Sequence, residues 1–159
     1  MNQAWENIEK LKGKQIKGVH LVLFVHKKGR NWNDSLLQIT FEDDSLVLLK
    51  GDGNDNLIVQ RSAWEDAFEG DLSEEDKTFI QENGKWSLFD VSGSQPYTKI
   101  LKERIQAAHP IRNQFNRLTG VQLQIGDLYL NFVNVADQSR ILWGVKNPEL
   151  SRWGNRVGN

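Results

Sequence analysis

Apolar residues along this chain recur in short runs, and the spacing within each run separates helices from strands. Residues 4–11 place apolar side chains three and four positions apart, which predicts a short amphipathic helix that ends at Gly13. Residues 16–25 are almost continuously apolar and rich in β-branched side chains, which favours a strand covered on both faces over a buried helix. A polar loop with an exposed Trp32 is expected to follow over residues 27–33.

Three further apolar runs are separated by turn-forming residues. The runs are 36–41, 46–49 and 57–59, and the segments between them, 42–45 and 51–56, consist only of Gly, Asp, Asn, Ser and Glu. Short apolar runs bounded in this way predict an antiparallel meander, in which each strand pairs with the one before it.

The middle of the chain carries helix signals. Ser62 and Glu65 form a capping box ahead of a helix that Gly70 ends, and Ser73 begins another helix in the same way. Apolar residues then recur at helical spacing after Pro96. We predict helices over residues 62–70, 73–84, 97–108 and 111–118, and a strand over residues 86–91.

The last third of the chain repeats the pattern of the meander. Its strands are predicted over residues 121–125, 128–135 and 140–145, and residues 151–159 form a polar tail that we expect to be loosely held. The predicted fold class is therefore α+β, with two antiparallel β-meanders and three or four covering helices.

The length of 159 residues fits one domain, and residues 1–150 are predicted to form it. Residues 9–16 and 116–123 share basic, Leu, Gly, Gln and aliphatic positions. This match raises the hypothesis of an internal duplication, with halves 1–93 and 94–150. The alternative is that both octets are ordinary junctions between a helix and a strand, which often look alike.

Composition excludes several classes of site. The chain has no cysteine, so disulfides, thiolate metal ligands and thiol catalysis are excluded. His20 and His26 share strand parity, but their Cα atoms would lie roughly 20 Å apart, too far to bind one metal ion. We expect neither a metal nor a cofactor. No apolar run approaches the roughly 18 residues of a membrane helix, so we expect a cytoplasmic protein without a membrane partner.

Motifs of enzyme chemistry are incomplete. Residues 51–56 begin like a dinucleotide-binding loop but lead into a strand. A calcium loop that starts at Asp52 would need Gly at its sixth position and Glu at its twelfth, where Leu57 and Ala63 stand. Residues 92–94 lack the flanking glycines of a nucleophile elbow. These absences argue against an enzyme, and they leave open one whose active site is assembled from scattered Asp, Glu and His.

The formal net charge of −1 conceals an uneven distribution. Residues 42–76 hold twelve Asp and Glu against Lys50 and Arg61, which is a local net charge of −10. If these side chains gather on one face, that face attracts a basic partner and disfavours acidic ones. Local structure offers a second explanation, because Asp and Glu are common in turns and in the first turns of helices.

Tryptophan is the other unusual component. Trp5, Trp64, Trp86 and Trp143 fit predicted core positions. Trp32 and Trp153 lie in polar surroundings, where an exposed indole ring serves as an interface anchor or folds over a local apolar patch.

The leading hypothesis is a non-enzymatic protein-binding module whose acidic segment docks a basic protein partner. The predicted partner-binding residues are acids in turns and one tryptophan: Glu42, Asp43, Asp44, Asp52, Asp55, Glu69, Asp71 and Trp32. In architecture, the alternation of meanders and capped helices resembles that of small immunity-type inhibitors. This resemblance implies, as one concrete partner, a nuclease-like toxin with a basic cleft.

Two other functions are kept as alternatives. The first is a small-ligand-binding or enzymatic domain with a pocket between the two meanders, involving His20, Asp127 or Asp137. The second is nucleic-acid binding through the basic ends of the chain, near Arg152 and Arg156. Nucleic acid is the less expected partner, because basic and aromatic residues are not interleaved and the net charge is near zero.

Overall fold

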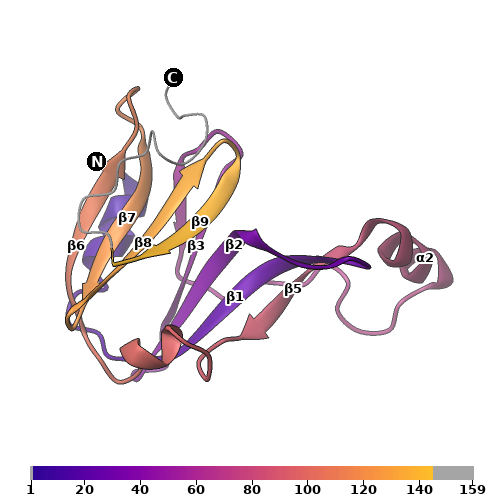
Figure 1. Ribbon diagram of the computed structural model, residues 1–159, viewed down its shortest axis with the longest axis horizontal. Helices are drawn as coiled ribbons and strands as arrows, with labels where there is room; N and C mark the ends of the chain where they lie inside the picture. The colour runs from indigo at the N-terminus through magenta and orange to yellow at the C-terminus, as the bar shows by residue number, and fades with distance from the viewer. Residues whose placement is uncertain (1, 145–159) are drawn as a thin grey trace.

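Two antiparallel β-sheets pack against each other in the computed structural model, which describes residues 2–144 (Figure 1). The first sheet has the strand order β4-β3-β2-β1-β5 and the second has the order β6-β7-β8-β9. The strands are β1 (Ile16–His26), β2 (Gly29–Phe41), β3 (Leu46–Gly51), β4 (Leu57–Gln60), β5 (Lys85–Asp90), β6 (Ile105–Arg112), β7 (Leu118–Ile125), β8 (Leu128–Val135) and β9 (Gln138–Trp143). Within the described residues, the α-helices are α1 (Gln3–Glu9) and α2 (Glu74–Asn83), and a 3-10 turn, η1 (Tyr97–Ile100), precedes β6. Two antiparallel sheets in a mixed fold are thus confirmed, with fewer helices than predicted.

Alternate residues of both sheets point into a shared apolar core. Val19, Leu21 and Leu23 on β1 and Leu130 and Phe132 on β8 belong to it, and each is at most 2% exposed. This pattern follows from the period of a strand, in which every second side chain lies on the same face. Removing one such side chain from water stabilises the fold by roughly 1.5–3 kcal/mol.

α1 covers one edge of the core. Its N-terminus is capped by the side chain of Asn2, which accepts a hydrogen bond from the backbone N–H of Ala4 at 2.8 Å. Ile8 is fully buried in the core, and the Asn7 side chain donates to the backbone carbonyl of Val59 on β4 at 3.0 Å. The helix predicted over residues 4–11 is confirmed.

α2 stands beyond the ends of β1 and β5, away from the core (Figure 1). It begins at Ser73, whose hydroxyl accepts from the backbone N–H of Asp76 at 3.1 Å, and ends at Gly84, where φ is 83°. A Cβ at Gly84 would overlap the carbonyl oxygen of Val25, so only glycine fits there. The helix predicted over residues 73–84 is confirmed.

No helix of the described residues is long and apolar enough to cross a membrane.

The other three predicted helices are wrong. Residues 62–70 form bends and a turn without a helix, residues 97–108 contain one 3-10 turn followed by β6, and residues 111–118 lead from β6 through a turn into β7. The spacing of Ile105 and Ala108 resembles one turn of a helix. A bulge in β6 after Ile105 instead lets both side chains face the core from a strand.

The predicted loop over residues 27–33 is shorter than expected. A two-residue turn at Lys27 and Lys28 leads directly into β2, so Trp32 lies on that strand. Its side chain is 57% exposed, as predicted.

The structure gives no support to the internal duplication. In the first octet Gly13 has φ 82° in the turn after α1, whereas its counterpart Gly120 lies within β7 against the carbonyl oxygen of Phe132. The two octets therefore fold differently. Residues 16–90 build the five-stranded sheet and residues 105–143 build the four-stranded sheet. The predicted tail over residues 151–159 lies outside the described residues.

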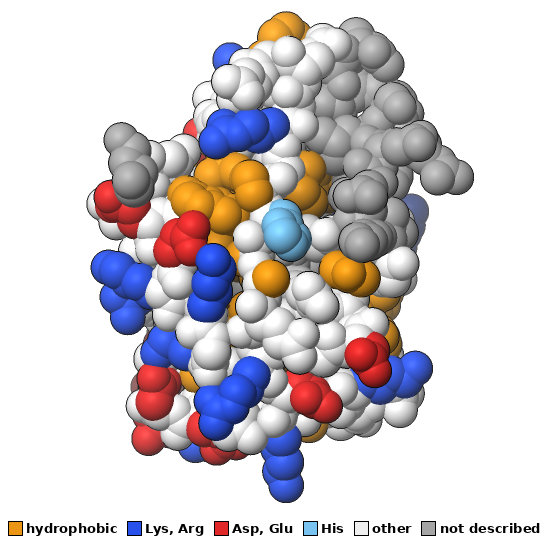
Figure 2. Space-filling model, turned by 90° about the vertical axis from the view of Figure 1, so that its left-hand side faces the viewer, with side chains coloured by type: hydrophobic (Ala, Val, Ile, Leu, Met, Phe, Trp, Pro, Cys, Tyr) orange, Lys and Arg blue, Asp and Glu red, His pale blue; other side chains and the backbone are white. Residues whose placement is uncertain are grey.

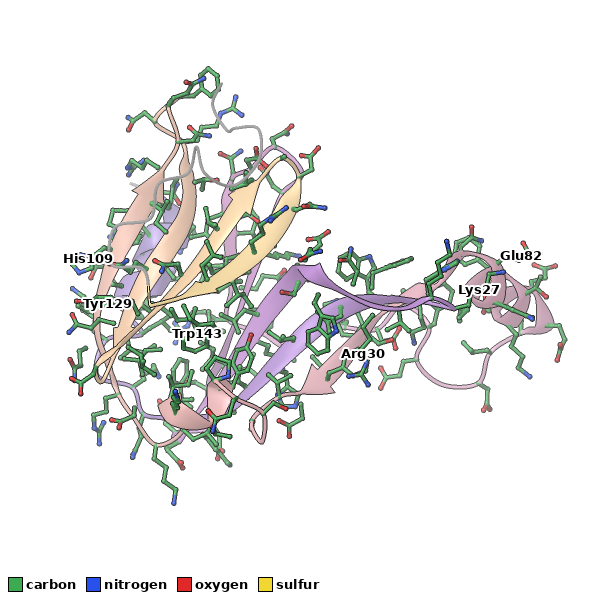
Figure 3. All side chains as sticks on the ribbon, viewed as in Figure 1. Lys27, Arg30, Glu82, His109, Tyr129 and Trp143 are labelled. Carbon is green, nitrogen blue, oxygen red and sulfur yellow. The ribbon has the colours of Figure 1, made fainter. Side chains whose placement is uncertain are left out.

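The face of the molecule that Figure 2 shows is mixed in charge. On the side of the molecule that carries β6, acidic and basic side chains alternate, and apolar side chains surround a histidine (Figure 2). His109 is exposed on β6, whereas Trp143 lies at the end of β9, where its ring meets that of Tyr97 edge-on, with centroids 5.3 Å apart (Figure 3). Trp5 and Trp143 pack against the core, as predicted.

We expect Phe132→Ala to lower the free energy of unfolding by about 3–5 kcal/mol, because it leaves a cavity between the two sheets. Denaturant titration measures this loss. The matched control is Phe115→Ala, whose side chain is 67% exposed and whose removal should change stability by less than about 0.5 kcal/mol. Equal losses for the two variants would contradict a core at Phe132.

Candidate functional site

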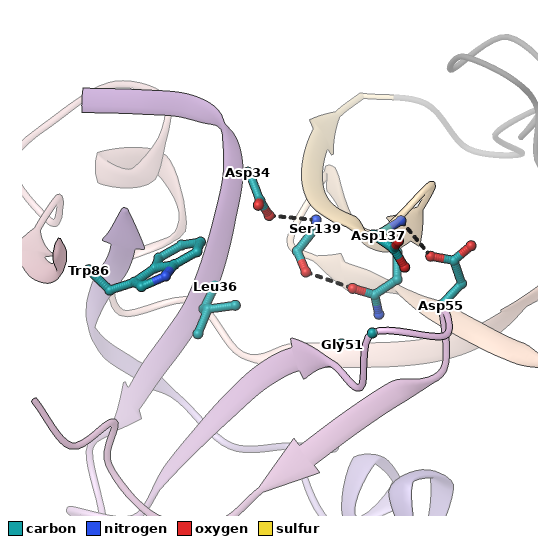
Figure 4. Close-up of a pocket in the computed structure, with 9 residues that line it drawn as sticks. Asp34, Leu36, Gly51, Asp55, Trp86, Asp137 and Ser139 are labelled. Carbon is teal, nitrogen blue, oxygen red and sulfur yellow. Dashed lines mark hydrogen bonds between the residues drawn. The ribbon is translucent and has the colours of Figure 1, made fainter. Parts of the chain in front are cut away.

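One hairpin turn from each sheet meets the other at one end of the core, and together with β2 they enclose a small cleft (Figure 4). The backbone N–H of Asp137, in the β8–β9 turn, donates to Oδ1 of Asp55, in the β3–β4 turn, at 2.9 Å. Oδ1 of Asp34 on β2 accepts from the backbone N–H of Ser139 at 2.9 Å. The cleft has a volume of about 160 Å³. It is lined by Asp34, Leu36, Gly51, Gly53, Asp55, Trp86, Asn134, Asp137 and Ser139.

The Asn134 side chain fixes the geometry of this cleft. It is 2% exposed, and its Oδ1 accepts from the hydroxyl of Ser139 at 2.6 Å. Its Nδ2 donates to the backbone carbonyls of Thr119 at 3.1 Å and Lys50 at 3.4 Å. One amide thereby connects β8 with β9, β7 and β3. Leaving such a buried group without a partner would cost about 1–3 kcal/mol, so the network holds the two sheets in one arrangement.

Two backbone features bring the sheets this close. Gly51 ends β3 beside Asn134, and a Cβ at this position would lie 2.5 Å from Oδ1 of that residue. On the opposite side Ala136 and Asp137 have φ of 52° and 63°, the conformation that a tight two-residue hairpin turn requires. An alanine rarely adopts positive φ, so the turn is held in place by its hydrogen bonds.

A larger, mainly apolar groove adjoins the cleft on the outer face of the five-stranded sheet. Its volume is about 310 Å³. It is lined by Leu36, Trp64, Glu65, Asp66, Ala67, Phe68 and Trp86. Leu36 and Trp86 line both hollows, so an aromatic-lined groove continues into a cleft that carries three carboxylates.

The segment between β4 and α2 forms one wall of this groove. The backbone N–H of Trp64 donates to Oε1 of Gln38 on β2 at 2.9 Å. Lys85 Nζ lies 2.6 Å from Oδ2 of Asp66, and this hydrogen bond, with a smaller one from the backbone N–H of Phe68, lowers the pKa of the Asp66 carboxyl. The wall is thus attached to both β2 and β5.

Aromatic contacts fix two of the rings that face the groove. Trp86 packs edge-on against Phe24 of the neighbouring strand β1, with ring centroids 5.7 Å apart. Phe68 stacks on Phe79 of α2, with centroids 6.0 Å apart. Such pairs hold aromatic surfaces in place before a ligand arrives.

The structure does not gather the predicted acidic residues on one face. Glu42, Asp43 and Asp44 form the β2–β3 turn, at the opposite end of β3 from the cleft. Lys14 Nζ lies 2.6 Å from Asp43, and this hydrogen bond, with one from Ser45, holds the pKa of the Asp43 carboxyl well below its usual range. Asp44 likewise pairs with a lysine, 3.0 Å away.

The other predicted partner-binding residues are also dispersed. Asp55 lines the cleft, whereas Asp52 is occupied within its own turn by the backbone N–H groups of residues 54 and 56. Glu69 and Asp71 are exposed in the segment between β4 and α2. Trp32 is exposed on β2 with the guanidinium of Arg30 5.9 Å from its ring centroid, and lines neither hollow. Binding by these residues stays a prediction.

Several lining residues were missed or misassigned from the sequence. The sequence pattern predicts Trp64 and Trp86 in the core, but they face the groove outside it. Trp86 shares strand parity with the exposed Leu88, and this alternation was the available signal. Nothing local marked Asp34 or Asn134, because their partners are distant in sequence.

The residues named for the alternative pocket separate in the structure. Asp137 lines the cleft, whereas His20 lies on β1 opposite Asp90, and Asp127 is exposed in the β7–β8 turn. Within residues 2–144, no group of His, Asp and Glu is arranged to hold a metal ion. Comparison with protein-family models, with curated proteins and with solved structures finds no match to this chain.

We expect Gly51→Ala to destabilise the fold by about 1–3 kcal/mol, because the added methyl group displaces the buried Asn134 amide. Thermal unfolding measures the loss. Gly93→Ala is the matched control, since nothing lies within 4 Å of a Cβ there. If Gly51→Ala were as stable as the control, the close approach of β3 to β8 would be wrong.

The Asp66–Lys85 pair predicts a dependence of stability on pH. The pKa of Asp66 is lowered in the folded state, so its contribution is present above the unfolded pKa of about 3.9 and is lost as the pH falls below it. We expect Asp66→Asn to remove up to about 1 kcal/mol at neutral pH and less near pH 3. Denaturant titrations at both pH values test this. Glu74→Gln, at an exposed pair on α2, is the control and should show little change.

Proposed function

We propose that this protein is a non-enzymatic protein-binding module that docks a basic segment of a partner protein. The docking surface is the cleft lined by Asp34, Asp55 and Asp137, together with the adjoining aromatic groove. The observation that carries the proposal is the continuity of these two hollows through Leu36 and Trp86. An apolar groove that opens beside carboxylates fits a segment in which apolar and basic side chains are close neighbours.

The size of the cleft favours one side chain over a free small molecule. Its volume is about 160 Å³, whereas sites for drug-sized ligands usually measure about 300–1,000 Å³. A cavity of about 150 Å³ holds a benzene-sized group. The planar guanidinium of an arginine side chain is of comparable size, so the cleft suits the end of one basic side chain.

The charges in the cleft favour a cation. Asp34 and Asp55 each use Oδ1 for a backbone N–H, which leaves the second carboxylate oxygen of each available to a ligand. Among residues 2–144, no lysine or arginine lies within ion-pair distance of Asp34, Asp55 or Asp137. An arginine from a partner would supply the missing positive charge and could donate two parallel hydrogen bonds.

The groove supplies the apolar part of the interface. Trp64, Phe68 and Trp86 present aromatic surface there, and tryptophan in a pocket is among the residues that contribute most to protein–protein affinity. Glu65 at the same groove adds negative charge, which speeds encounter with a basic partner. An inhibitor that fills the basic cleft of a nuclease-like toxin is one case of such a module.

The alternative is a small-ligand or enzymatic site between the two meanders. The position of the cleft fits it, because the cleft lies where a hairpin of one sheet meets a hairpin of the other. A ligand confined to the cleft would be a small cation such as an organic amine, and it would bind without using the groove.

We expect a capped peptide of alternating leucine and arginine to bind the full chain and to change the fluorescence of Trp64 and Trp86. Affinity should fall at least tenfold between about 0.05 M and about 0.5 M salt, because the contact is electrostatic. The variant Asp34→Asn/Asp55→Asn/Asp137→Asn should bind at least tenfold more weakly at low salt. Asparagine keeps an oxygen that can accept the backbone N–H groups, so the melting temperature should change little.

The matched control removes the same number of charges at the far end of β3, by Glu42→Gln/Asp43→Asn/Asp44→Asn. It should bind the peptide within about twofold of the natural protein. A larger loss in this control than in the cleft variant would contradict the cleft. Binding that is insensitive to salt would contradict an electrostatic docking surface altogether.

A further inference from the structure

β5 is an edge strand whose outer side is uncovered among the described residues. It pairs only with β1, and the backbone N–H of Val91 just beyond it donates to the carbonyl of Val19 at 3.0 Å. In an antiparallel pair, every second residue of a strand forms its backbone hydrogen bonds with that neighbour. Because Val91 bonds to β1, the backbone groups of Phe89 also point toward β1, and those of Leu88 and Asp90 point away from the sheet. Among residues 2–144, β5 has no strand neighbour besides β1, and no backbone group of a turn or loop bonds to Leu88.

The other three sheet edges carry protection. On β4 the side chain of Asn7 binds a backbone carbonyl, and on β9 the carboxylate of Asp34 binds a backbone N–H. On β6 Pro110 has no N–H to offer. Natural proteins protect edge strands because an exposed edge is a template for another strand. The open edge of β5 is therefore suited to receive one.

Side chains along this edge define what such a strand must carry. On the outer face, Trp86 borders the groove, Leu88 is 40% exposed, and Asp90 follows as an exposed acid. On the other face, the guanidinium of Arg30 lies 3.9 Å from the ring centroid of Phe89, beside β5 (Figure 3). The edge thus presents two apolar positions and an acid on one face, and a cation on the other.

We propose that an extended segment of the partner protein adds to β5 as an antiparallel strand. From its N- to its C-terminus, the segment first places a basic side chain opposite Asp90. An acidic side chain follows opposite Phe89, within reach of Arg30, and an apolar side chain lies opposite Leu88. A second apolar side chain follows opposite Trp86, at the mouth of the groove. This inference rests on the proposed function, since it gives the backbone conformation and side-chain order of the same basic partner.

The direction of the added strand leads it toward the cleft. After the position opposite Trp86 the segment leaves the edge beside the groove, and Trp86 also lines the cleft. Neighbouring strands are about 4.8 Å apart, so β2 lies three spacings, or roughly 14 Å, from the added strand. About four or five further residues, the last of them basic, can span that distance to the carboxylates.

A second copy of this chain fits the edge less well. Antiparallel pairing of β5 with itself about Leu88 sets Trp86 of each copy opposite Asp90 of the other. Asp90 would then face an indole instead of a cation, and Arg30 would gain no acidic partner. Charge complementarity therefore selects a different protein as the occupant.

The first test uses the capped peptide Thr-Lys-Glu-Leu-Thr-Leu-Thr, whose order matches the edge, and amide NMR of the full chain. We expect the amide of Leu88 to exchange rapidly in the free protein and to gain at least tenfold protection when the peptide is added. A peptide with Lys and Glu exchanged has the same composition and should bind at least tenfold more weakly. Absence of any change at the amides of β5, or equal binding of the two peptides, would overturn the proposal.

The second test removes the outward N–H with Leu88→Pro. Proline is tolerated on an edge strand where the N–H faces solvent, so the pairing with β1 should survive, which the melting temperature verifies. Leu88→Ala is the matched control, because it removes the side chain and keeps the N–H. We expect at least tenfold weaker peptide binding for Leu88→Pro than for Leu88→Ala, and equal affinities would overturn the proposal.

Two outcomes separate this inference from the proposed function. If Leu88→Pro binds the peptide Thr-Lys-Glu-Leu-Thr-Leu-Thr normally while the triple cleft variant loses the leucine–arginine peptide, strand addition is wrong and the cleft is still supported. If translational diffusion shows self-association that Leu88→Pro abolishes, the occupant is a second copy and the proposed partner is wrong for this edge.

Discussion

Side chains from both sheets meet in one core, and every other feature of the molecule is positioned by that contact. Ile39 and Phe132, both fully buried, come from opposite sheets and belong to the same apolar cluster. Because a strand points alternate side chains to opposite faces, fixing these residues inward also fixes which residues point outward. Leu36 on β2 and Trp86 on β5 consequently face the groove, and a slip of one residue in β2 would exchange the core and the surface.

Polar hydrogen bonds then fix the position of one sheet relative to the other. The core is apolar and has little directional preference, whereas the Asn134 amide requires Ser139, Thr119 and Lys50 at defined distances. Asp34 and Asp55 extend the same network to the rim by accepting backbone N–H groups of the opposite sheet. The carboxylates are thereby presented by a rigid frame, which reduces the entropy lost when a partner binds.

Local patterns in the sequence predict much of this fold, but they do not predict the site. The apolar runs gave the strands of the first sheet, and Ser73 with Gly84 marked α2. The pattern predicts a helix where β6 lies, because the bulge in this strand sets Ile105 and Ala108 three positions apart on one face. The cleft depends on contacts such as Asp34 with Ser139, which are 105 residues apart and leave no trace in local spacing. The negative charge of residues 42–76 is visible in the sequence, but the strand β3 separates the acidic turn at residues 42–45 from the acidic turn at residues 51–56.

The exposed position of α2 has a consequence for local unfolding. The helix has ten residues and buries none of them, and a helix of this length is marginal in water without tertiary support. One of its side chains, Phe79, stacks on Phe68 of the groove wall. The first part of the molecule to melt should therefore be this helix, at temperatures where the two sheets are intact. Phe68 would then lose its neighbour, so the shape of the groove is coupled to the helix–coil equilibrium of a segment that lies outside it.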